Sequence, residues 1–172
     1  MIPSELEAQL ESLHSESFGW AWSCCGHDET EAEDVLQTTY LKIITGKARF
    51  EGRSSFKTWV FGVVRRTAQE VSRRTQAEHK RMIRLVTDEL EDPSTSSPDR
   101  ELAKSEDARR LVRAMKKLSD RQREILHLVF YQDLTISEAS KVMGISLGSA
   151  RTHYERGKGR LRDLLREDEN VA

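Results

Sequence analysis

The sequence predicts an all-α protein of two small helical domains joined by a flexible acidic linker. Apolar residues recur at intervals of three, four and seven positions, as on the buried face of a helix, and no stretch alternates with a period of two. Three of these runs open with a capping box, in which Ser or Thr is followed three residues later by Glu or Gln. The length of 172 residues allows one or two domains, and the 33% of charged residues fits a soluble helical protein.

The first domain is predicted over residues 1–86. An early helix carries Leu6, Leu10 and Leu13 at helical spacing. The capping box Thr30-x-x-Glu33 predicts the start of a second helix. Its expected inward residues are Ala32, Val35, Leu36, Tyr40 and Ile43, and its expected outward residues are Asp34, Gln37, Thr38 and Leu41.

A basic loop, KARFEGRSS, follows Gly46 and leads into a long helix that is predicted to start at about Ser55. The apolar stripe of this helix comprises Phe56, Trp59, Val60, Val63, Val64, Ala68 and Val71. Its exposed side is expected to carry Arg65, Arg66, Arg73 and Arg74. These arginines are suited to contacts with a phosphate backbone.

Residues 87–106 are predicted to be a linker, because they contain Pro93, Pro98, several serines and almost no large apolar residue. Residues 107–172 form the second predicted domain. In it, the capping boxes Ser119-x-x-Gln122 and Thr135-x-x-Glu138 open two helices, and a turn at Gly144 leads to a longer helix that starts near Ser146. A short helix, a turn with glycine and a longer helix predict a helix-turn-helix, a motif that places its second helix in the major groove of DNA.

Charge is segregated along the chain although the net charge is only −1. The balance is −8 over residues 1–46, +8 over 47–84, −5 over 85–106 and +5 over 107–168. Two basic blocks separated by an acidic one indicate two local contacts with a polyanion rather than one general patch.

No feature of the sequence predicts an enzyme, a cofactor or a metal. The five histidines are scattered, and no glycine-rich loop is present to hold a phosphate. Cys24, Cys25, His27 and Asp28 could be read as metal ligands, but the cluster lacks a second half at matching spacing. Adjacent cysteines rarely form a disulfide. The N-terminus is acidic and the chain has no long apolar run, which argues against a signal peptide or a membrane span. We therefore expect a cytoplasmic protein.

The segments EAEDVLQTTYLKI and FEGRSSFKTWVFGVVRRTAQEVSRR, followed by the helix-turn-helix, resemble the extracytoplasmic-function (ECF) sigma factors of bacterial RNA polymerase. The resemblance covers about residues 10–85 and 107–165. It implies that Asp34 and Gln37, with Thr38 and Leu41 beside them, bind the clamp coiled coil of core polymerase. It also implies that the free protein is a monomer and that an anti-sigma factor is a further partner to consider.

The same resemblance assigns the promoter contacts. The basic loop and the start of the long helix would read and open the −10 element. Of the residues concerned, Trp59 fits the apolar stripe of the helix and is more naturally a core residue. The residues concerned are Phe50, Arg53, Ser55, Phe56, Trp59, Arg65, Arg66, Arg73 and Arg74. The second helix of the helix-turn-helix would read the −35 element through Ser149, Arg151, Thr152, Glu155, Arg156 and Lys158.

The sequence therefore predicts a non-enzymatic factor that directs core RNA polymerase to promoter DNA. Two alternatives stay open. One is a helix-turn-helix regulator that never engages polymerase, and the other is an interaction module that sequesters a protein partner. Binding to core polymerase distinguishes the first prediction from the regulator, and salt-dependent DNA binding distinguishes both from the interaction module.

Overall fold

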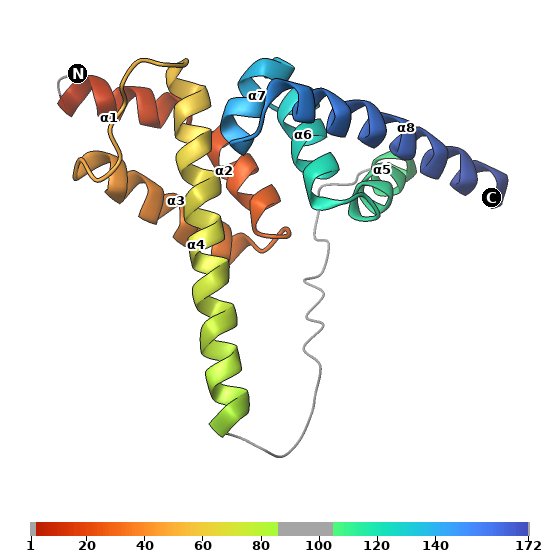
Figure 1. The fold of residues 1–172 in the computed structure, drawn as a ribbon, viewed down its shortest axis with the longest axis horizontal. Helices are drawn as coiled ribbons and strands as arrows, with labels where there is room; N and C mark the ends of the chain where they lie inside the picture. The colour runs from red at the N-terminus through yellow and green to blue at the C-terminus, as the bar shows by residue number, and fades with distance from the viewer. Residues whose placement is uncertain (1–2, 86–104, 172) are drawn as a thin grey trace. The chain divides into compact units, whose positions relative to one another are not determined.

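A computed structural model gives the fold and describes residues 3–85 and 105–171. Within these ranges the chain forms eight α-helices and no strand, which confirms the all-α prediction (Figure 1). The helices are α1 (Pro3–Ser12), α2 (His14–Cys24), α3 (Glu29–Ile44), α4 (Phe56–Leu85), α5 (Glu106–Lys116), α6 (Asp120–Phe130), α7 (Ile136–Met143) and α8 (Leu147–Val171).

The chain divides into two compact units, residues 1–51 with 63–98 and residues 52–62 with 99–172. Most of the predicted acidic linker lies outside the described residues. Its last two positions are described: the Ser105 hydroxyl accepts a hydrogen bond from Ala108 N, and Glu106 is the first residue of α5. The predicted domain boundaries at residues 86 and 107 stay a prediction.

The early helix of the sequence prediction is two helices. α1 ends at Ser12 and α2 begins at His14, with Leu13 between them at φ −95° and ψ 0°. α1, α2 and α3 pack on one another. Trp20 and Val35 are fully buried there, and burial of side chains of this size stabilises the unit by about 1.5–3 kcal/mol each.

The predicted capping box at Thr30 is wrong. α3 begins at Glu29, and the side chain of Asp28 accepts a hydrogen bond of 2.9 Å from Glu31 N. Asp28 has the extended backbone of an N-cap, so Thr30 already lies inside the first turn. Asp is as good an N-cap as Thr, and its charge is also favoured at the positive end of the helix.

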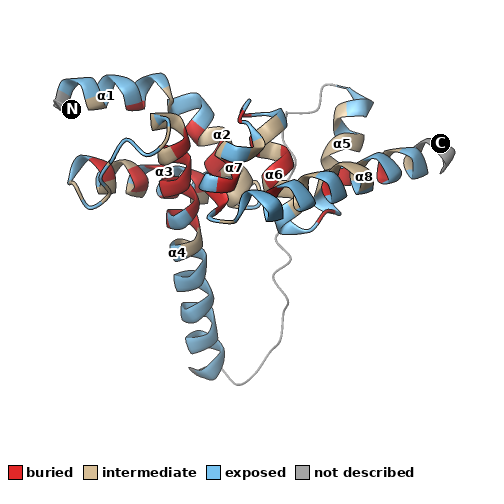
Figure 2. Ribbon diagram, turned by 45° about the horizontal axis from the view of Figure 1, so that its top comes forward, coloured by how far each residue is buried: buried red, intermediate tan, exposed pale blue. Residues whose placement is uncertain are grey.

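α4 is the longest helix, with 30 residues. The hydroxyl of Ser55 accepts a hydrogen bond from Thr58 N, so the helix starts where the sequence predicts. Its buried side is wider than predicted, since it also includes Thr58, Phe61 and Thr67. Every residue from Ser72 to Arg84 is exposed, so the C-terminal half of α4 has no packed face (Figure 2).

In the second unit, α8 packs against α5, α6 and α7. Both predicted capping boxes are confirmed: Ser119 with Gln122 opens α6, and Thr135 with Glu138 opens α7. The core contains Ile125, Leu126, Leu128, Ala139, Val142, Met143, Ala150 and Leu164. These residues hold α8 in a fixed place on the unit.

Candidate functional site

α7, the turn at Gly144 and α8 form the predicted helix-turn-helix. Gly144 ends α7 in the left-handed conformation, with φ 64° and ψ 35°, which glycine adopts without strain. Ile145 N then donates to Ser140 O, and the Ser146 hydroxyl caps α8 by accepting from Ser149 N at 3.1 Å. The turn therefore joins α7 to α8 within a few residues, and the start of α8 is exposed.

The exposed side of α8 carries the residues predicted to read DNA. Ser149, Arg151, Thr152, Glu155 and Arg156 are all exposed. Lys158 is only partly exposed, because its ammonium lies 5.1 Å from the ring centre of Tyr154 and 3.7 Å from Glu155 Oε2. Guanidinium, hydroxyl and carboxylate groups on one helix face can form hydrogen bonds with base edges and phosphates.

Gly157 explains how α8 approaches α6 so closely. A Cβ atom at this position would lie 3.1 Å from Gln122 Cβ and 3.3 Å from Leu126 Cδ1. Gly159 differs, because a Cβ atom there would meet nothing within 4 Å. The glycine at 157 therefore serves packing, whereas the glycine at 159 only weakens the helix.

The basic loop and the start of α4 carry both aromatic side chains and a cation. The rings of Phe56 and Trp59 lie 5.5 Å apart, and both side chains are partly exposed, as is Phe50. Arg53 is exposed on the loop. Trp59 is therefore not a fully buried core residue, and an aromatic face remains accessible for stacking against a base.

The expected exposure of Arg65 is wrong. Arg65 retains only 8% of its accessible surface, while Arg66 on the next position is exposed, as are Arg73 and Arg74. Arg65 follows Phe61 by four residues and precedes Ala68 by three, so it shares their buried face. It is a poor candidate for a phosphate contact.

The outward face of α3 combines polar and apolar groups. Asp34, Gln37 and Leu41 are exposed as predicted, and Thr38 is half-buried. Leu41 is 61% exposed and Ile44, one turn further along, is 56% exposed. Ile44 was not predicted as part of this surface. Two exposed aliphatic residues next to an acidic group are typical of a protein-binding face.

Two families of sigma-factor domains match the chain: Sigma-70 region 2 over residues 10–78 and Sigma-70 region 4 over residues 114–163. The ECF RNA polymerase sigma factor SigX of Bacillus subtilis is 30% identical over 146 residues, which cover 82% of this chain and 75% of SigX. This chain is an ECF sigma factor. The RNA polymerase sigma factor YlaC of the same organism is 25% identical over 169 residues, or 96% of each chain.

As a sigma factor, the protein directs core RNA polymerase to promoter DNA. Solved sigma factors share its fold. RpoE from Bartonella quintana, in complex with the anti-sigma factor NepR, has a TM-score of 0.70 at 22% identity, over 94% of this chain and 97% of RpoE. CnrH, in complex with the cytosolic domain of CnrY, has a TM-score of 0.60 at 22% identity, over 94% of this chain and 88% of CnrH.

None of the described helices is long and apolar enough to cross a membrane. Across residues 3–85 and 105–171, no three His, Cys, Asp or Glu side chains are placed to hold a metal ion. Neither Cys24 nor Cys25 is in a disulfide, and burial, with smaller effects of Glu31 and Asp28, raises the pKa of Cys25 to about 12. Asp28, a ligand candidate in the sequence, serves as the N-cap of α3.

A single lysine ties α3 to α4 in the first unit of the sigma factor. Lys42 Nζ donates hydrogen bonds to Glu70 Oε2 at 2.6 Å and to the buried Thr67 Oγ1 at 3.2 Å. The hydrogen bond from Lys42 lowers the pKa of Glu70, with smaller contributions from the charges of Arg74 and Arg73. These contacts link α3 to α4.

We expect the stabilising effect of this ion pair to disappear in acid. Because the folded-state pKa of Glu70 lies below the ordinary value of 4.5, its contribution is present above pH 4.5 and is lost as the pH falls through the lower folded-state value. Glu70→Gln should therefore lower the free energy of unfolding at pH 7 by no more than about 1 kcal/mol, since the pair is half-exposed. Urea unfolding at pH 7 and pH 3 measures the effect, with Glu78→Gln, at an exposed site on α4, as the control. An equal loss at both pH values would contradict the assignment.

Proposed function

We propose that this sigma factor reads the −35 element of its promoters with the exposed side of α8. The contact residues are Ser149, Arg151, Thr152, Glu155, Arg156 and Lys158. The observation that carries the proposal is the exposure of this face on a helix whose opposite side, at Ala150, Gly157 and Leu164, is buried. Arg151 is the main candidate for a bidentate contact with guanine, and Glu155 for a contact with cytosine N4.

The −10 element is proposed to contact the basic loop and the start of α4. Phe50, Phe56 and Trp59 offer aromatic surface to an unstacked base, while Arg53, Arg66, Arg73 and Arg74 offer charge to the backbone. Ser55 is placed as the cap of α4 and acts by fixing the start of that helix. Arg65 is left out of this set because it is buried.

The outward face of α3 is proposed as the docking surface for core polymerase. It comprises Asp34, Gln37, Thr38, Leu41 and Ile44. Strand opening would draw on binding energy alone, so we propose no catalytic role for any residue and a place of action beside polymerase in the cytoplasm. An anti-sigma factor is a further proposed partner, since RpoE and CnrH are described in complexes with NepR and with CnrY.

Transcription with purified core polymerase tests the whole proposal. The protein would be added to core enzyme on a genomic DNA library, and the 5′ ends of the RNA would be sequenced. New start sites that share a spaced pair of upstream motifs are expected. A protein that binds DNA but yields no new start site with core polymerase would contradict the proposal and favour a regulator.

A double substitution tests the docking surface separately. Leu41→Ser with Ile44→Ser should weaken binding to core polymerase at least tenfold, because both side chains lose apolar contact with the partner. The free energy of unfolding should change by less than about 0.5 kcal/mol, since both positions are exposed. Titration of fluorescent protein with core enzyme measures the affinity. Met82→Ser with Ile83→Ser, at sites exposed to a similar degree, is the matched control, and equal weakening by both pairs would contradict the assignment.

A further inference from the structure

Three further cations near the C-terminal end of α4 extend the row of arginines already assigned on this helix. At 3.6 residues per turn, six cations fall within about 120° of the helix circumference. This basic stripe comprises Arg66, Arg73, Arg74, Lys80, Arg81 and Arg84. All six are exposed, and at 1.5 Å per residue the stripe is about 27 Å long. Its last three members, here called the distal basic turn, lie beyond the residues that match the region 2 family.

One carboxylate, Glu70, falls within the same arc, and it is already neutralised. Lys42 on α3 holds it at 2.6 Å, so the charge does not cancel the stripe. Glu78 lies outside the arc by about 40° at the same helical spacing. The stripe therefore presents a continuous positive face to a partner.

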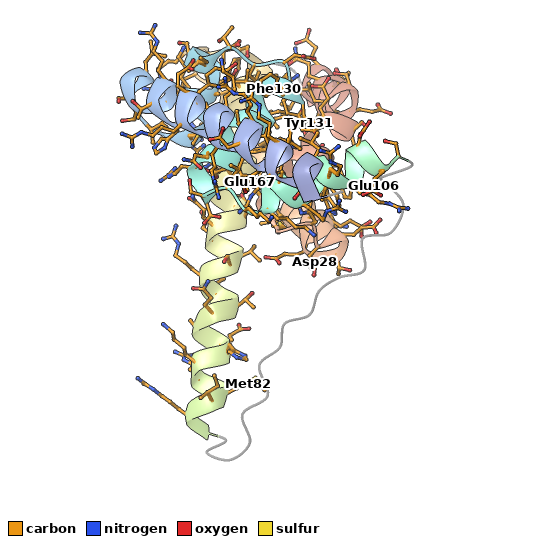
Figure 3. All side chains as sticks on the ribbon, turned by 90° about the vertical axis from the view of Figure 1, so that its right-hand side faces the viewer. Asp28, Met82, Glu106, Phe130, Tyr131 and Glu167 are labelled. Carbon is orange, nitrogen blue, oxygen red and sulfur yellow. The ribbon has the colours of Figure 1, made fainter. Side chains whose placement is uncertain are left out.

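The arrangement does not serve the fold of the free protein. Residues 72–84 are all exposed, so no apolar burial stabilises this part of the helix (Figures 2 and 3). Lys80 and Arg84 are four residues apart, and like charges at that spacing destabilise a helix by about 0.2–0.5 kcal/mol. A bound polyanion would remove this repulsion.

We propose that the distal basic turn binds the phosphates of double-stranded DNA immediately upstream of the −10 element. The inference rests on the proposed function, in which the start of α4 contacts the −10 element. Lys80 lies about 36 Å along the helix axis from Phe56, which corresponds to about ten base pairs of duplex. The residues proposed to read the −35 element follow Leu85 in the sequence, and the −35 element lies upstream of the −10 element, so we assign the distal basic turn to upstream, paired DNA.

The test measures holoenzyme binding to a promoter fragment as a function of salt. The variant Lys80→Gln, Arg81→Gln, Arg84→Gln removes the three charges and keeps good helix formers at these positions. Loss of three phosphate contacts lowers the slope of log K against log salt by about 2.7, so between 50 and 200 mM salt the wild type should lose about 40-fold more affinity than the variant. Met82→Gln with Ile83→Gln, in the same turn but outside the stripe, is the control and should match the wild type. Figure 3 labels Met82 on this turn.

Neutral methylphosphonates locate the contact on the DNA. Placed in the ten base pairs upstream of the −10 element, they should weaken binding of the wild type and leave the triple variant unaffected. An unchanged salt slope, or equal sensitivity of both proteins, would overturn the proposal. If neutral linkages weakened binding only when placed downstream, the proposal would also be overturned, and the distal basic turn would be assigned to other DNA. If the triple variant lost binding to core polymerase, the proposal would be overturned and the turn assigned to polymerase. Wild-type initiation at the same promoter checks the proposed function independently.

Discussion

Replacing Arg151 with alanine is expected to lower transcription from promoters of this sigma factor by about 5- to 150-fold, because a bidentate contact with a base contributes about 1–3 kcal/mol. Arg151 is exposed in the first turns of α8, and alanine favours a helix, so the fold should be kept. Start sites on a promoter library measure the loss, and core binding measured by titration should stay unchanged.

Arg109→Ala is the matched control for this substitution. Arg109 lies on α5, outside the helix-turn-helix, is exposed, and has its guanidinium 3.9 Å from Glu106 Oε2. It should leave promoter choice unchanged. If Arg151→Ala reduced core binding and promoter use to the same extent, the assignment of Arg151 to the −35 element would be wrong.

Substitution of two neighbouring glycines by alanine is expected to have opposite effects on stability. Gly159→Ala should raise the free energy of unfolding by about 1 kcal/mol, since the added methyl group meets no atom within 4 Å and glycine weakens a helix. Gly157→Ala should lower it by about 1–3 kcal/mol, because the Cβ atom would press on Gln122 and Leu126. Thermal and urea unfolding of the two variants measure the difference. Stabilisation by both substitutions would show that α6 and α8 can move apart at no cost.

The sequence predicts the helices well where local signals act alone. The capping boxes at Ser119 and Thr135 are reciprocal pairs within one turn, so they do not depend on the rest of the fold. Near the start of α3, Asp28 and Thr30 are both residue types that cap helices, and Asp28 is the N-cap in the structure. Local sequence does not decide between two residues that cap with similar energy.

The sequence predicts candidate site residues less well where their role depends on whether the side chain is buried. Arginine is a residue type that often contacts DNA, but Arg65 lies within the wide buried side of α4. Isoleucine is usually a core residue, but Ile44 is exposed on α3, as is Leu41. The packing role of Gly157 is also hidden, because it depends on how closely α6 approaches α8.

The environment of Cys25 disfavours ionisation of its thiol. Burial, with smaller effects of Glu31 and Asp28, raises its pKa to about 12, so the thiol form predominates at pH 7. Peroxides and disulfides react with the thiolate, so Cys25 is almost inert toward both. Cys25 is therefore poorly suited to sensing an oxidant.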